Sequence, residues 1–184
     1  KRYNGTNNGE DRAHGIVVDS YNNYTITGYS LRNTSPDSRD IATIQYDKNG
    51  VVKWTKIYNG PDNLSDNAFG ITVDGPGNIY IAGSSGRLQN DEDFTTIKYS
   101  NTGVEKWAAF YNSGERTSDI AYDIKVSSTG NEIFVAGSGV NGESEKIEVA
   151  KYNYNGELLQ NIQYPGFGRV NCIRLNNQNN VFLG

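Results

Sequence analysis

The chain has 184 residues, a formal net charge of −4, and only 35% hydrophobic residues. Nucleic acid requires a concentrated basic face and a membrane-spanning helix requires roughly 18 apolar residues in a run, so we expect neither a nucleic-acid partner nor a membrane span. The 21 Gly and 13 Tyr, with many Asn and Ser, are instead typical of short strands joined by many turns.

The first residues, KRYNG at 1–5, match TKIYNG at 55–60. We therefore expect residues 1–5 to form the last strand of a preceding repeat unit. The chain contains no Met and opens on no signal peptide, which favours a processed or partial piece of a longer protein.

Each repeat unit begins with two short apolar segments joined by a turn. The first segments are GIVVD, GITVD, DIKVS and CIRLN, at residues 15–19, 70–74, 123–127 and 172–176. The second segments read YTITG, IYIAG, IFVAG and VFLG and end at Gly28, Gly83, Gly137 and Gly184. The Gly and Asn between them supply the positive φ angles of tight hairpins, so we predict an antiparallel pair of strands in each unit.

Two further segments follow in each complete unit. The third segments are IATIQY, FTTIKY and IEVAKY, and the fourth are VVKWTKIY, VEKWAAFY and ELLQNIQY. Their connections, DKNG, SNTG and NYNG, end in Gly as hairpin loops do. One period runs through these segments, because Tyr46, Tyr99 and Tyr152 are 53 residues apart.

Four short antiparallel strands in about 50 residues, repeated along the chain, are typical of β-propeller blades. We predict one all-β domain over residues 1–184, a partial β-propeller of four-stranded antiparallel blades, about three and a half in number. Its units are expected at residues 13–60, 68–113, 121–166 and 170–184.

The segments AFGITVDGPGNIYIAGSS and DFTTIKYSNTGVEKWAAFYNSG resemble the bacterial β-propeller repeat called SBBP, with a looser likeness to NHL-type propellers. The resemblance covers essentially the whole chain, although Ser127 replaces the Asp of Asp19 and Asp74, and Gln160 replaces the Trp. It implies a bacterial protein that is extracellular, on the cell surface or periplasmic, in a family mostly without known catalytic residues.

A single blade exposes two faces that it cannot bury alone, and stacking blades side by side buries both. The predicted strands make fewer than four blades, whereas closed propellers typically have about 4–8. We therefore expect a protein or glycan partner to cover the open blade faces, as part of a larger propeller. Assembly with other chains into a ring is the alternative.

One position immediately before each first strand varies while the residues around it repeat. It is occupied by His14, Phe69, Tyr122 and Asn171. If these residues ring one mouth of a central channel, variable side chains on a constant scaffold suit ligand contact. Plain tolerance of substitution at a loop position is the other interpretation.

Asp11, Asp66 and Asp119 each stand five residues before the Ile of the first strand. A repeated loop Asp is a weak candidate for ligating a hard cation such as Ca²⁺. It also caps a turn by accepting backbone N–H bonds, which is the role we expect. The acidic residues between the second and third segments, densest at 91–93, present the same choice between a cation site and a solvated edge.

The two tryptophans, Trp54 and Trp107, lie on fourth segments. They are predicted either to pack between blades or to form stacking platforms for sugars.

The hypothesis for function is a non-catalytic secreted or cell-surface scaffold that binds protein or glycan partners, with no cofactor. A rigid structural segment of a surface assembly is compatible with it. The alternative is a propeller enzyme, a lyase or hydrolase, with its site at the channel mouth. Its acid and base groups would have to come from the three aspartates and His14, the only histidine.

Overall fold

The computed structural model describes residues 3–5, 8–33, 35, 38–88, 91–114, 118–141, 144–164 and 168–184. The described residues are all-β, and none of them forms a helix long and apolar enough to cross a membrane. The strands are β1 (Asp11–Val18), β2 (Tyr24–Leu31), β3 (Arg39–Tyr46), β4 (Val52–Tyr58), β5 (Asp66–Val73), β6 (Ile79–Arg87), β7 (Asp91–Tyr99), β8 (Glu105–Tyr111), β9 (Ser118–Val126), β10 (Glu132–Asn141), β11 (Ser144–Asn153), β12 (Leu158–Tyr164), β13 (Ile173–Leu175) and β14 (Val181–Leu183).

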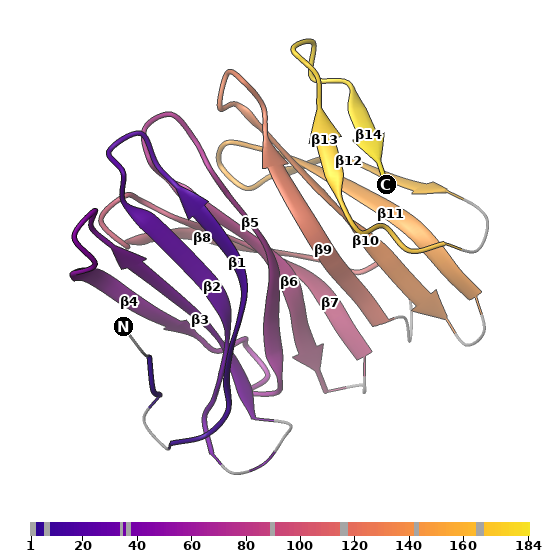
Figure 1. Cartoon of the computed structure of the whole chain (residues 1–184). Coiled ribbons are helices and arrows are strands. Elements are labelled where there is room, and N and C mark those ends of the chain that lie inside the picture. Colours follow the sequence, from indigo (N-terminus) through magenta and orange to yellow (C-terminus); the bar gives the residue numbers. More distant parts are fainter. Residues whose placement is uncertain are drawn as a thin grey trace.

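The strands form successive antiparallel units, which follow one another from the indigo to the yellow end of the chain (Figure 1). Unit 1 is β1–β4, unit 2 is β5–β8, unit 3 is β9–β12, and unit 4 is the pair β13–β14. The first strands of neighbouring units, β1, β5, β9 and β13, lie next to one another. One parallel pair, Glu92 with Ser118, joins units 2 and 3 into a single sheet. Within the described residues, no strand of unit 1 pairs with unit 4 to close a ring.

Tight turns connect the third and fourth strands of units 1–3. Gly50, Gly103 and Gly156 have φ values of +79°, +78° and +86°, a region that favours glycine. In the first of these turns, Asp47 Oδ1 accepts the N–H groups of Asn49 and Val51 at 2.9 and 2.8 Å. The predicted hairpins are therefore present, and the turn residues adopt the positive φ for which the sequence selects Gly.

The first strands of units 1–3 begin earlier than predicted, because each contains a β-bulge. In β1, Ala13 pairs with Gly28 and Gly15 pairs with Thr27, so His14 between them is paired with no residue of β2. On the N-terminal side of His14, β1 continues to pair with β2 as far as Asp11. Phe69 in β5 and Tyr122 in β9 are skipped in the same way. An extra residue in a strand reverses the alternation of side chains between its two faces. The alternating pattern of the first strand therefore ends at the bulge when only the sequence is considered.

The residue opposite each bulge must be a glycine. A Cβ atom on Gly28 would collide with the carbonyl oxygen of Arg12, and one on Gly83 with that of Asn67. Gly137 faces the same obstruction. The recurring glycine that we took as the end of the second strand therefore lies inside it, and β2, β6 and β10 continue beyond the bulge.

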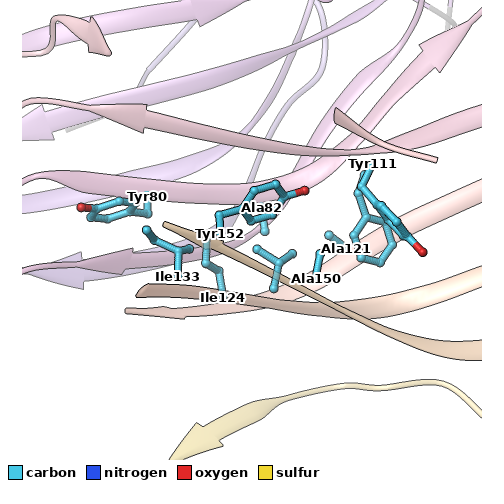
Figure 2. Packing of buried hydrophobic residues seen from close by; sticks show 10 residues of the cluster. Tyr80, Ala82, Tyr111, Ala121, Ile124, Ile133, Ala150 and Tyr152 are labelled. Atoms are coloured by element: carbon cyan, nitrogen blue, oxygen red, sulfur yellow. The ribbon is translucent and has the colours of Figure 1, made fainter. Parts of the chain in front are cut away.

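The apolar cores lie between the units. Figure 2 shows the core between units 2 and 3, where Tyr80, Ala82 and Tyr111 meet residues of unit 3 such as Ile124 and Tyr152. A second cluster joins units 1 and 2, and a third joins units 3 and 4. Each unit therefore shelters its neighbour, as expected for sheets that cannot bury their own faces.

Both tryptophans pack between units, so of the two predictions for them the packing role is confirmed. Trp54 contacts the core between units 1 and 2 and lies 6.0 Å from Tyr99, centroid to centroid. Trp107 contacts the core between units 2 and 3 and lies 6.4 Å from Tyr152.

The expected strand at residues 1–5 is not found in the part that the structure describes. Residues 3–5 lie in no strand, and residues 1–2 are outside the described part. A fourth strand pairs with the third strand of its own unit, and residues 1–184 supply no such third strand before Tyr3.

Candidate functional site

The extra residue of each bulge is the position that varies between units. The His14 ring stacks on Phe69 with centroids 5.2 Å apart and planes 9° apart, and Phe69 contacts Tyr122 at 5.7 Å. The Nδ1 of His14 also donates to the carbonyl oxygen of Ala68 at 2.7 Å. We call His14, Phe69 and Tyr122 the bulge row. The three side chains form a continuous line of rings across units 1–3.

Asn171, the fourth predicted member, does not share this geometry. It precedes β13, and its backbone N–H donates to the carbonyl of Gly184 at 2.8 Å. The unit 4 residue found against Tyr122 is Arg169, whose guanidinium carbon lies 5.1 Å from the ring centroid. The structure thus brings together three of the four predicted residues. They lie within strands rather than in loops, and no closed channel surrounds them in the part of the chain described.

A pocket of about 340 Å³ opens beside His14 and Phe69. Arg12 and Arg39 line it, with guanidinium carbons 5.9 and 5.0 Å from the ring centroid of Tyr29. The Nε of Arg39 is buried and has no hydrogen-bond partner among the described residues. A guanidinium in this position is suited to bind a carboxylate or another planar oxyanion.

An acid, Glu92 of unit 2, also lines the pocket. Ser84 donates to Glu92 Oε1 at 3.3 Å. Burial raises the pKa of Glu92, although the Ser84 hydrogen bond and the positive charge of Arg39 act in the other direction. Unit 3 repeats the pair, because Ser138 donates to Glu145 at 3.0 Å. The pocket therefore holds both signs of charge beside an aromatic row.

The three repeated aspartates adopt one geometry. Each lies inside a first strand rather than in the expected loop, because the bulge carries the pairing past it. Each accepts the backbone N–H of the residue six positions before it. The donors are Gly5, Gly60 and Ser113, at 2.9, 2.6 and 2.7 Å. The predicted role of accepting backbone hydrogen bonds at a connection is present in all three units.

Among the residues that the structure describes, no three His, Cys, Asp or Glu side chains gather to hold a metal ion. In the acidic run at 91–93, Asp93 pairs with Arg87 at 2.9 Å and accepts a hydrogen bond from Asn112 at 2.8 Å. Residues 34, 36–37, 89–90 and 142–143 of the neighbouring loops lie outside the described part.

Sequence reasoning missed the pocket residues around the bulge row. Tyr29, Ser84 and Ser138 occupy one position, directly after the glycine that faces the bulge. Arg39 and Glu92 occupy another, on the third strand. An alignment of the units at these two positions would have shown further variable sites. Such an alignment requires the true ends of the second and third strands, which could not be recognised in the sequence because of the bulge.

Residues 53–86 match a known sequence family, the SBBP beta-propeller repeat. The match confirms the resemblance for this segment, which runs from β4 of unit 1 through β5 and β6 of unit 2. The matched module therefore crosses the interface between units and includes the Phe69 bulge. A search of the curated proteins found no match to the chain.

Proposed function

We propose that units 1–4 are about three and a half blades of a β-propeller, and that the chain is a non-catalytic scaffold that binds a protein or glycan at the cell surface or outside the cell. The observation that carries this proposal is the bulge row. One backbone geometry recurs in three units, and it presents a different ring each time.

The setting of the bulge row favours recognition over a purely structural role. Bulges re-aim a side chain out of the sheet while the paired strands around it hold the backbone in place. His14 is exposed and Phe69 is half-buried, so both rings remain accessible beside the pocket. The buried Arg39 Nε adds a polar group that a ligand oxygen would satisfy.

The alternative, a lyase or hydrolase, requires an acid and a base that converge on one substrate atom. The aspartates expected to serve are engaged with backbone N–H groups, and His14 Nδ1 is engaged with Ala68. Glu92 is an acid whose pKa burial raises, and the groups that act on it are Ser84, Arg39 and Asp66, the last of which accepts the Gly60 N–H. These contacts support binding over catalysis.

Arrayed neutral and acidic glycans provide the test. We expect the chain to bind a subset of acidic glycans, and we expect Arg12→Ala and His14→Ala each to weaken that binding by about tenfold, equivalent to about 1.4 kcal/mol. Lys48→Ala, on an exposed turn away from the pocket, is the matched control and should bind as the parent does. Glycan binding that ignores both pocket variants, or turnover of an arrayed glycan, would contradict the proposal.

A further inference from the structure

The third strands of units 2 and 3 carry an acid at the same position, but the next unit places a different side chain beside each acid. Glu92 and Glu145 both accept a hydrogen bond from a serine of their own unit, at 3.3 and 3.0 Å. The neighbouring residue from the next unit stands four positions before its first-strand isoleucine. It is Ile120 beside Glu92 and Arg169 beside Glu145.

At the interface between units 3 and 4, the charge of the acid is compensated by the chain itself. The Nε of Arg169 lies 3.3 Å from Oε1 of Glu145. The same guanidinium lies over the Tyr122 ring, with its central carbon 5.1 Å from the ring centroid. A carboxylate and an aromatic ring of the bulge row therefore hold one cationic group between them.

At the interface between units 2 and 3, the acid has no such cation. Ile120 and Glu92 both line the pocket beside the bulge row. Among the described residues, no cationic group lies within ion-pair distance of Glu92. Burial and the charge of Asp66 raise the pKa of Glu92, whereas the Ser84 hydrogen bond and the charge of Arg39 lower it. A cationic group of a ligand would offset the cost of burying this carboxylate.

The same pocket also offers a group that binds anions. Arg39 holds the position of Glu92 in unit 1, so neighbouring units contribute opposite charges to one pocket. The Nε of Arg39 is buried, and no acceptor binds it in the part of the chain described. Asn67, which holds the position of Ile120 in unit 2, adds an amide to the lining. A ligand that carries both a carboxylate and an ammonium group would therefore satisfy Arg39 and Glu92 together.

We propose that this pocket binds a sugar residue that carries both a carboxylate, bound by Arg39, and a free ammonium group, bound by Glu92 beside Ile120. The inference rests on the proposed function and names the kind of acidic glycan that the site accepts. The ammonium group takes the role that Arg169 has beside Glu145. The pocket volume of about 340 Å³ lies near the lower end of the range for small-molecule sites, about 300–1,000 Å³, which suits a single sugar residue better than a broad protein surface.

Two closely related sugars test the proposal. Muramic acid and N-acetylmuramic acid share one carboxylate, but only the first has a free amine. Each is titrated into the full chain at mildly acidic pH, where the amine is protonated, and backbone amide shifts are followed by NMR. We expect muramic acid to bind at least about tenfold more tightly and to shift the amides of Asn67 and Phe69, which line the pocket. Glucosamine, which has the amine without the carboxylate, should bind more weakly than muramic acid.

Three variants assign the preference to the acid of unit 2. Glu92→Gln keeps the size of the side chain and removes its charge, so it should abolish the preference for muramic acid. Ile120→Arg supplies a guanidinium where unit 4 has Arg169, and it should abolish the preference as well. Glu145→Gln is the matched control, because that acid is already paired with Arg169, and the preference should persist.

The outcomes separate this inference from the proposed function. N-acetylmuramic acid that binds the parent chain as tightly as muramic acid would overturn the inference and leave the binding of acidic glycans intact. Binding of neither sugar would overturn it too, and the proposed function would fail with it if no arrayed acidic glycan binds. A preference that survives Glu92→Gln would also contradict the inference. A dipeptide of lysine and aspartate that binds more tightly than muramic acid would overturn it by assigning the pocket to a protein partner.

Discussion

The same position of the first strand is exposed in unit 1 and buried in unit 3. Ile16 and Ile124 occupy equivalent positions in β1 and β9, yet they are 61% and 0% exposed. Both strands have the same bulge and the same pairing to a second strand. The difference shows that a unit forms its strands from its own sequence, whereas the burial of its faces is supplied by the neighbouring unit.

This division explains how the fold is stabilised. Apart from the pair that joins β7 and β9, the strands pair within each unit, but the large buried side chains meet at the interfaces, as Tyr80, Ile124 and Tyr152 do (Figure 2). Because apolar burial is the dominant favourable term in folding, the interfaces contribute most of the stability of the chain. Within the described residues, units 1 and 4 are each covered on one face, so they bury less apolar surface against a neighbour than units 2 and 3 do.

The largest expected effect comes from the two isoleucines. Ile124→Ala should lower the free energy of unfolding by about 2–4 kcal/mol, because it leaves a cavity in the closed interface. Ile16→Ala should cost less than about 1 kcal/mol, because little apolar area is lost at an exposed site. Urea denaturation of both variants measures the difference. Equal losses would mean that the face of unit 1 is covered in solution.

The turn glycines allow a second comparison between an exposed and a covered face, with a smaller expected loss of stability. Gly50→Ala and Gly103→Ala place the same side chain at the same positive φ, so the backbone strain is common to both. Only at position 103 does the new methyl group meet a ring, that of Trp54. We expect Gly103→Ala to be the more destabilising by about 1–2 kcal/mol.

Thermal unfolding of Gly50→Ala and Gly103→Ala measures the difference in their stability. Gly156→Ala provides a second substitution beneath a tryptophan ring. Gly156→Ala should follow Gly103→Ala, since its methyl group would meet Trp107. Identical losses at positions 50 and 103 would show that the Trp54 contact contributes nothing to the interface.

Much of the fold could be predicted because it is encoded locally. The turn residues require a positive φ, and the 53-residue period of the tyrosines repeats each strand, so the four-stranded antiparallel units followed from the sequence. The candidate site followed only in part. The position of His14 was found because it varies within a repeated frame, but its partner Phe69 stands 55 residues away, and their stacking depends on how the units pack.

The pocket beside His14 could not be predicted from the sequence for the same reason. Arg39 looked like the end of an ordinary loop, and nothing in its local sequence shows that it lies over Tyr29. That contact exists because β2 and β3 extend past the bulge. The aspartates were predicted correctly as acceptors of backbone N–H groups and wrongly as loop residues, because a bulge hides the continuation of a strand from the alternation pattern.

The last expected effect depends on pH and concerns an acid in the interface between units 2 and 3. Glu148 of β11 occupies the position of Ala42, which lines the open pocket of unit 1. It is 1% exposed, and burial together with the nearby charge of Asp119 raises its pKa from 4.5 to about 7, although Lys146 and hydrogen bonds from Ser113 and Gln163 oppose the shift.

A raised pKa means that the folded chain binds the Glu148 proton more tightly than the unfolded chain does. The contribution of this group to stability is therefore greatest below its unfolded pKa of 4.5, and it is lost as the pH rises through about 7. Glu148→Gln keeps an oxygen to accept from Gln163 but cannot ionise. We expect the variant to gain up to about 3 kcal/mol relative to the parent between pH 4.5 and pH 7.5.

Urea midpoints of parent and variant across that range provide the measurement. The difference between them isolates Glu148 from the other buried acids, such as Asp40, whose pKa is raised to about 6 by burial in unit 1. Ala42→Glu would place the same carboxyl group beside the pocket of about 280 Å³ in unit 1, and we expect its stability to change less than that of the parent over the same pH range. A pH dependence as strong at position 42 as at position 148 would show that the two faces are equally closed to solvent.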